Sequence, residues 1–257
     1  MPFCADLFYR SYIGGSEGFV FPVILLHGMG GSLMGWPSSL RRLPGQRVVA
    51  LDLPGHGHSN QPACRSISSL VGRLHQFISD MGFYHVILVG YSLGGALALS
   101  YASSYPDQII GLVAISCGDQ VVIPQELLSA LSKPADIRIA VEVFSKAAFH
   151  PAFPQAERRA ILAPMTMAGS DALLADLSIA TEFRLDHQPA LLKFPSLVIG
   201  GSDDLITSPA SLRRLGYCLQ RPSLVFIEGA GHMVIYEKNE ELRTIVSAFL
   251  AKINKPG

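Results

Sequence analysis

The stretch His85-Val-Ile-Leu-Val-Gly-Tyr-Ser-Leu-Gly-Gly95 decides the fold. It begins with a continuous apolar run, which is typical of a strand buried on both faces. A Gly-x-Ser-x-Gly turn follows, and the uncharged sequence from Leu93 to Tyr105 is predicted to form a helix. In such a strand–turn–helix the glycines permit a sharp turn that exposes the serine oxygen, and the helix N-terminus is directed at it. Ser92 is therefore the first candidate nucleophile.

Short apolar runs alternate with helical patterns on both sides of this turn. The other predicted strands are Leu7–Tyr12, Val20–Leu26, Arg47–Leu51, Gly111–Ile115, Ser196–Ile199 and Ser223–Ile227. Helices are predicted at Ser66–Met81 and Pro209–Leu219, and at the C-terminus, where the apolar residues from Leu242 to Ile253 share one stripe. This alternation predicts an α/β fold, with a mostly parallel central sheet and helices on both faces.

The alternation stops between Asp119 and Lys193. This segment offers no convincing strand, is punctuated by prolines, and holds 16 of the 40 charged residues of the chain. We expect residues 119–193 to be a helical cap inserted after the sixth strand, with residues 1–118 and 194–257 forming the core. The apolar residues of the cap either fill a small helical core or face downward to line an apolar pocket.

A serine hydroxyl needs a base to accept its proton, and His232 is the best candidate among eight histidines. It directly follows the last predicted strand, in Glu228-Gly-Ala-Gly-His-Met233. That position puts it at the carboxyl edge of the sheet, the same edge as Ser92.

The base in turn needs a carboxylate that orients its ring. Asp203 and Asp204 both follow the predicted strand Ser196–Ile199. The chain order of serine, then aspartate, then histidine is expected of a fold in which the serine lies on a strand–turn–helix, and it differs from the trypsin-like and subtilisin-like orders. The residues themselves do not decide between the two aspartates.

With these motifs the chain resembles the α/β-hydrolase superfamily, in its compact group with a helical cap. The resemblance rests on five features, which are His27-Gly-Met-Gly-Gly31, Asp52-Leu-Pro-Gly-His-Gly-His-Ser59, the turn at Ser92, Gly201-Ser-Asp-Asp204 and Gly229-Ala-Gly-His232. It implies the α/β-hydrolase fold. It also favours Asp204, because members place the acid in G-x-x-D followed by apolar residues and then Pro or Thr. Finally, it implies an oxyanion hole formed by the backbone N–H groups of Met29 and Leu93.

The expected activity is that of a serine hydrolase acting on a small, largely apolar carboxylic ester or thioester, through an acyl-enzyme on Ser92 and without a cofactor. The candidates for lining the substrate pocket are His27, Gly28, Tyr91, Phe144, Phe149, Met165, Phe183 and Met233. The same three residues could instead serve lyase, enol-lactonase, carbon–carbon hydrolase or perhydrolase chemistry. A non-catalytic ligand-binding protein is the third class.

Composition narrows the possible partners. The formal net charge is zero, which gives no basic field for nucleic acid. Two uncharged windows, Gly18–Leu40 and Val86–Pro106, are long enough to span a membrane, but glycine, serine and histidine interrupt both. The four dispersed cysteines and the absence of a basic leader indicate free thiols and a cytoplasmic protein. Asp52, His56 and His58 are not expected to bind a metal, because they lie on a turn of proline and glycine. The sequence leaves the oligomeric state open.

Overall fold

A computed structural model describes residues 2–14, 21–59, 62–121, 123, 125–131, 137–167, 170–185, 192–220 and 222–253. Within these residues eight strands form one sheet in the order β1-β2-β4-β3-β5-β6-β7-β8. The strands are β1 Phe3–Cys4, β2 Leu7–Ile13, β3 Val23–Leu26, β4 Arg47–Leu51, β5 Val86–Tyr91, β6 Ile109–Ile115, β7 Ser196–Gly201 and β8 Ser223–Ile227.

The sheet is mostly parallel, as predicted. All neighbouring strands from β4 through β3, β5, β6 and β7 to β8 are paired in parallel, whereas β1 and β2 are antiparallel to their neighbours. Every residue of β3, β5 and β7 is buried, which explains why these strands appear in the sequence as continuous apolar runs.

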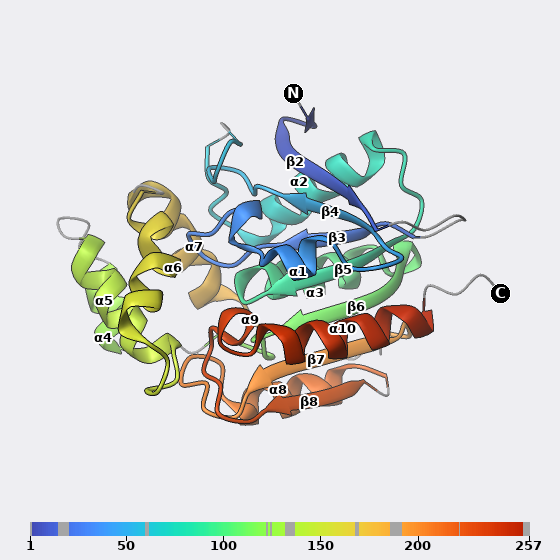
Figure 1. Cartoon of the computed structure of the whole chain (residues 1–257). Helices are drawn as coiled ribbons and strands as arrows, with labels where there is room; N and C mark the ends of the chain where they lie inside the picture. Colours follow the sequence, from blue (N-terminus) through green and yellow to red (C-terminus); the bar gives the residue numbers. More distant parts are fainter. Residues whose placement is uncertain are drawn as a thin grey trace.

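Helices cover both faces of the sheet (Figure 1). Helices α1 Ser38–Arg41 and α10 Asn239–Ile253 contact each other in front of the sheet in this view. Helices α2 Ile67–Asp80 and α3 Leu93–Ser104 contact each other behind it. Helix α8 Pro209–Cys218 packs on β7 and β8, and the short α9 Val234–Glu237 leads into α10.

Among the described residues, four helices lie between β6 and β7 in the chain. The insertion therefore follows the sixth strand, as expected, although one of these six strands is the unpredicted β1. The four helices are α4 Gln125–Leu131, α5 Ile137–Ala148, α6 Gln155–Met167 and α7 Ser170–Glu182, and we call them the helical insertion. Figure 1 shows them together at the left of the molecule. Near its two ends, Gln120 and Arg184 form an isolated β-bridge. The division into a core and a cap at residues 119 and 193 stays a prediction.

The observed elements differ from the predicted ones mainly at their ends. Strand β5 extends through Tyr91 to the residue before Ser92, and β6 begins at Ile109, two residues before the predicted start. Val20, the predicted start of β3, lies outside the described residues. The two-residue β1 was not predicted, because so short a strand shows no periodicity.

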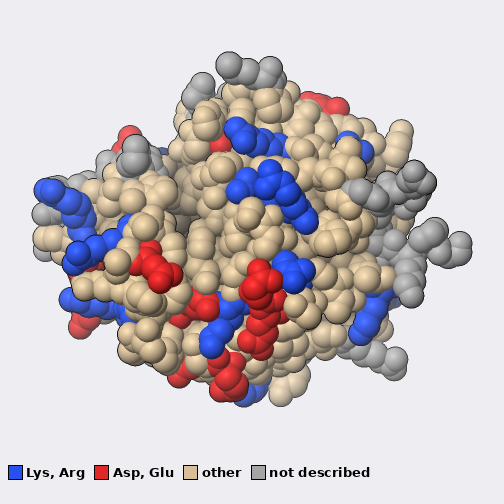
Figure 2. Space-filling model, in the orientation of Figure 1, with Lys and Arg blue, Asp and Glu red and all other residues tan. Residues whose placement is uncertain are grey.

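The charge-free window Val86–Pro106 belongs largely to the interior of this fold. Val86–Pro106 contains β5, the turn at Ser92 and all of α3, whose residues from Leu93 to Leu99 are buried. Within the described residues no single helix is long and apolar enough to cross a membrane, and one pair, Gln155–Thr166 with Asp171–Glu182, meets those criteria only jointly and is bent by 102°. Figure 2 shows basic and acidic side chains on the surface of both the core and the insertion. All four cysteines are free thiols, as predicted.

Candidate active site

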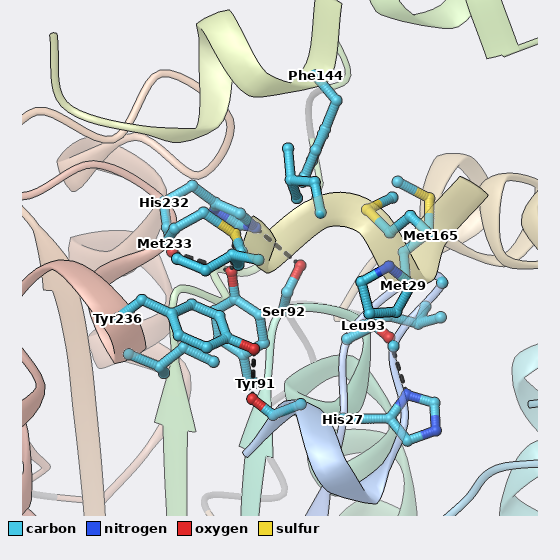
Figure 3. Close-up of a pocket in the computed structure, with 18 of the residues that line it drawn as sticks. His27, Met29, Tyr91, Ser92, Leu93, Phe144, Met165, His232, Met233 and Tyr236 are labelled. Carbon is cyan, nitrogen blue, oxygen red and sulfur yellow. Dashed lines mark hydrogen bonds between the residues drawn. The ribbon is translucent and has the colours of Figure 1, made fainter. Parts of the chain in front are cut away.

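Ser92 lies in a strained turn between β5 and α3. Its backbone angles are φ 52° and ψ −115°, a conformation that is costly for a residue with a side chain. The two flanking glycines make the turn possible. A Cβ at Gly90 would lie 2.2 Å from the carbonyl oxygen of Gly94, and one at Gly94 would lie 2.0 Å from that of Leu26. Close backbone approach therefore requires glycine at both positions, and the turn directs the Ser92 side chain toward the pocket (Figure 3).

His232 connects Ser92 to a buried carboxylate. Its Nε2 lies 2.9 Å from Ser92 Oγ, and its Nδ1 lies 2.9 Å from Asp204 Oδ2. With Nδ1–H donating to the carboxylate, Nε2 is free to accept the Ser92 hydroxyl proton. His232 is 1% exposed and Asp204 is 3% exposed, so the hydrogen bond between them is shielded from water.

Two adjacent aspartates have different environments. Asp204 Oδ1 accepts the backbone N–H groups of Ile206 and Thr207, both at 2.8 Å, and this leaves Oδ2 for His232. Asp203 is exposed and accepts the Ser202 hydroxyl at 2.6 Å. The structure therefore brings Asp204, and not Asp203, to the histidine.

Two hydroxyl groups hold the backbone of His232. Ser116 Oγ donates to the His232 carbonyl at 2.9 Å, and Tyr91 Oη donates to the same oxygen at 3.2 Å. Burial, followed by the nearby Tyr236, Asp204 and Glu237, raises the pKa of Tyr91 well above its ordinary value. Tyr91 therefore stays protonated and remains a donor, and neither hydroxyl was recognised from the sequence as a support for His232.

The glycine loop, which we define as His27–Gly31, faces Ser92 from the side opposite His232 (Figure 3). It is closed by the Gly31 N–H, which donates to the Gly28 carbonyl at 3.1 Å. Figure 3 places Met29 beside Leu93, next to the serine. The N–H of Leu93 opens α3 and so has no acceptor within its own helix.

His27 supports this loop rather than acting as a base. Its Nδ1 lies 2.9 Å from the Gly28 carbonyl, and its Nε2 accepts the Leu53 N–H at 3.0 Å. Burial, reinforced by the neighbouring His56, lowers the pKa of His27 to about 3. The ring is therefore neutral near pH 7, with Nδ1 as the donor.

A cavity of about 290 Å³ lies above Ser92. Six of the predicted lining residues do line it, namely His27, Gly28, Tyr91, Phe144, Met165 and Met233. The sequence did not identify further apolar lining residues, among them Met34, Trp36, Ile161, Leu162, Ile206 and Ile235. Among the described residues that line this cavity there is no Asp, Glu, Lys or Arg.

Phe149 and Phe183, which were also predicted to line the substrate pocket, are not placed at this cavity by the structure. Both are buried, at 2% and 3% exposure, but neither is among the lining residues. Phe149 stacks on Phe153 with a ring separation of 5.2 Å inside the helical insertion. Apolar patterning predicts burial of a side chain but not which interior surface it contacts.

Two carboxylates that connect the insertion to the site were missed in the sequence. Asp176 of α7 accepts the Gly30 N–H at 2.8 Å and lies 2.9 Å from His56 Nε2. Glu237 of α9 accepts the N–H groups of Gly231, at 3.0 Å, and His150, at 2.8 Å. Asp176 is an isolated charge in the apolar run Ala172-Leu-Leu-Ala-Asp-Leu177, which was the only available signal.

The turn at Asp52 has a structural role. Asp52 accepts the N–H of Leu33 at 2.6 Å and that of His58 at 2.9 Å, so both carboxylate oxygens are bonded. Across the described ranges, no group of three or more His, Cys, Asp or Glu side chains is arranged to hold a metal ion.

Comparison with known proteins identifies a family and several relatives. A family model described as the alpha/beta hydrolase family matches residues 23–245. The acetyltransferase component of an acetoin cleaving system from Pseudomonas putida is 32% identical over 251 residues, which are 93% of this chain and 65% of that protein, so the chain spans about two thirds of its length. A 2-hydroxy-6-oxononadienedioate/2-hydroxy-6-oxononatrienedioate hydrolase from Burkholderia vietnamiensis is 27% identical over 90% of this chain and 87% of its own.

Solved structures have the same fold. An enol-lactonase from Burkholderia xenovorans superposes with a TM-score of 0.85 at 21% identity, covering 95% of this chain and 96% of the other. A thermophilic esterase superposes with a TM-score of 0.79 at 27% identity, covering 90% of each chain.

Proposed function

Because the chain belongs to the alpha/beta hydrolase family, we propose that it hydrolyses carboxylic esters or thioesters through an acyl-enzyme on Ser92. One observation supports this most strongly. His232 lies 2.9 Å from Ser92 Oγ through one ring nitrogen and 2.9 Å from Asp204 through the other. A serine, a histidine and a buried carboxylate in this order form a nucleophile, its base and the group that orients the base.

In the acylation step, Ser92 Oγ attacks the acyl carbon while its proton passes to His232 Nε2. Asp204 stabilises the imidazolium and keeps Nδ1 protonated. The oxygen of the tetrahedral intermediate is negative, and the backbone N–H groups of Met29 and Leu93 are the proposed donors to it. His232 then gives the proton to the departing alcohol or thiol.

In the deacylation step, a water molecule replaces the alcohol. His232 accepts its proton, the resulting hydroxide attacks the acyl carbon, and the proton returns to Ser92 as the acid leaves. This cycle uses no cofactor. The proposal also includes a small-molecule substrate and a location in the cytoplasm.

The cavity favours an uncharged, apolar acyl group. Within the part of the chain that the structure describes, the side chains that line it include no Lys or Arg, and a carboxylate buried without a cation would be strongly destabilised. The name of the dienedioate hydrolase relative indicates a substrate with two carboxylates, for which this lining provides no charged partner. Ester hydrolysis is therefore favoured over that carbon–carbon cleavage, while lactonase, lyase and perhydrolase activities would use the same three residues. A binding protein without activity would have no use for an activated serine.

Replacing Ser92 tests the proposal. We expect Ser92→Ala to lose at least about 10³-fold of kcat on p-nitrophenyl butyrate, because the nucleophile is gone. Ser104→Ala is the matched control, since Ser104 is exposed at the other end of the same helix. Full activity of Ser92→Ala, with the folded state verified by circular dichroism, would contradict the proposal.

A further inference from the structure

The carboxylate of Asp176 joins the helical insertion to the glycine loop. A single oxygen, Oδ2, accepts the N–H of Gly30 at 2.8 Å and lies 2.9 Å from His56 Nε2. Asp176 is 4% exposed and His56 is 3% exposed, so this junction is buried. Asp176 itself is not among the residues that line the cavity.

The hydrogen-bond partners of His56 indicate that it is protonated and forms an ion pair with Asp176. Its Nδ1 lies 3.1 Å from the carbonyl oxygen of Pro54, and its Nε2 faces the carboxylate. Both nitrogens therefore face acceptors, which requires a proton on each of them. Burial alone lowers the pKa of His56, but the hydrogen bond and the charge of Asp176 outweigh it, and the pKa is raised.

The insertion also contacts Gly30 directly. Gly30 has φ +62°, and a Cβ there would lie 2.6 Å from Leu173 of α7 and 3.2 Å from Met165 of α6. Met29 and Gly30 are the central residues of the turn that the Gly31 N–H closes onto the Gly28 carbonyl. Asp176 holds the Met29–Gly30 peptide by accepting its N–H. The Gly31 N–H holds the Gly28–Met29 peptide by donating to its carbonyl oxygen.

We propose that Asp176 is a positioning residue. By fixing the Met29–Gly30 peptide it fixes the orientation of Met29, so that the Met29 N–H, which belongs to the preceding Gly28–Met29 peptide, is directed at the oxygen that becomes negative during attack by Ser92. Oxyanion stabilisation then depends on α7 being seated on the core. Residues of α5, α6 and α7 line the cavity together with residues of the core, so the seating of the insertion shapes both the cavity and the oxyanion hole. This inference rests on the proposed function.

The test uses two double variants, because removing Asp176 alone leaves the charge of His56 buried without a partner. In His56→Gln/Asp176→Asn the amide oxygen can still accept the Gly30 N–H. In His56→Gln/Asp176→Ala the acceptor is absent. Asp171→Asn, an exposed carboxylate on the same helix, is the matched control.

The measurements are kcat and KM on p-nitrophenyl butyrate and the rate at which a fluorophosphonate labels Ser92, at a temperature where each variant is folded. We expect the alanine variant to lose about 10- to 100-fold in kcat and in labelling rate, with KM within about 3-fold, because the oxyanion contact that Asp176 positions acts only in the transition state. The asparagine variant should recover most of that loss, and Asp171→Asn should match the unmodified protein.

Equal kcat and labelling rates in the alanine and asparagine variants would overturn the inference, since Asp176 would then only stabilise the fold. A rise in KM alone would do the same. Absence of labelling in the unmodified protein would instead overturn the proposed function, so the two failures are distinguishable.

Discussion

Asp203 and Asp204 show how a shift of one residue along the chain changes the role of a side chain. Asp204 is buried, and its carboxylate forms three hydrogen bonds, with the N–H groups of Ile206 and Thr207 and with His232. Asp203 is exposed beside Ser202. Two backbone N–H groups fix the Asp204 carboxylate, so its free oxygen orients the imidazole.

We expect Asp204→Asn to reduce kcat by about 10⁴-fold, because an amide next to Nδ1 no longer favours the required tautomer. Asp203→Asn is the neighbouring control and should stay within about 2-fold, since exposed charges contribute little. Steady-state kinetics on p-nitrophenyl butyrate measure both. A larger loss in Asp203→Asn than in Asp204→Asn would contradict the assignment, because Asp203 would then be the acid that orients His232.

At the residue scale, the sequence predicted those site residues that lie in short, recognisable motifs. Ser92 and His232 follow predicted strands within recognisable glycine-rich turns, so their meeting at one sheet edge could be predicted. The choice of Asp204 came from the resemblance, because both aspartates have the same place in the pattern. Asp176 and Ser116 act through hydrogen bonds to distant backbone groups, and no local pattern identifies such contacts.

At the scale of elements, the helical insertion contacts both loops that flank Ser92. Asp176 connects α7 to the glycine loop, and Glu237 connects the His232 loop to the segment between α5 and α6. The Met233 N–H also donates to the Ala148 carbonyl at 2.9 Å. The position of the insertion and the geometry of the site are therefore linked.

Removing Glu237 should weaken this connection. We expect Glu237→Ala to lower the free energy of unfolding by about 1–3 kcal/mol, because the N–H groups of Gly231 and His150 lose their acceptor. Glu240→Ala is the control, since Glu240 forms only an exposed pair with Arg243, and its change should stay within about 0.5 kcal/mol. Urea unfolding measures both, and equal stabilities of the two variants would contradict this interpretation.

Most elements could be predicted because their periodicity is strong. The buried strands are continuous apolar runs, and α2 and α10 each have one apolar stripe. Strand ends were less accurate, because β5 and β6 extend into turns whose sequence favours no particular boundary. The side of the insertion that Phe149 and Phe183 face depends on how its helices pack, which the order of residues alone does not determine.

At the scale of the whole molecule, the described residues that line the cavity include no Asp, Glu, Lys or Arg, whereas charged side chains lie on the surface. The 40 charged residues balance to zero, and Figure 2 shows those of one face on the exterior of both the core and the insertion. The cavity lining is apolar apart from the polar groups around Ser92. Neutrality of the chain gives no information about the substrate, whereas the uncharged lining does.

This distribution predicts selectivity against charged acyl groups. We expect kcat/KM for p-nitrophenyl butyrate to exceed that for the mono-p-nitrophenyl ester of succinate by at least about 100-fold, because the succinyl carboxylate would be buried without a cation. Ile161→Lys, which adds a cation to the lining on α6, should reduce this ratio of kcat/KM values. Equal efficiency toward both esters in the unmodified protein would contradict this substrate class.

The central claim is that Ser92 is the nucleophile, and mapping a fluorophosphonate adduct tests it most directly. The protein is treated with the reagent, the modified peptide is identified by mass spectrometry, and residual p-nitrophenyl butyrate hydrolysis is measured on the same sample. We predict one phosphonyl group on Ser92, loss of activity in proportion to labelling, and no adduct in Ser92→Ala. Hydrolysis at the full rate while Ser92 carries the adduct, or an adduct on another residue that accounts for the loss, would contradict the claim.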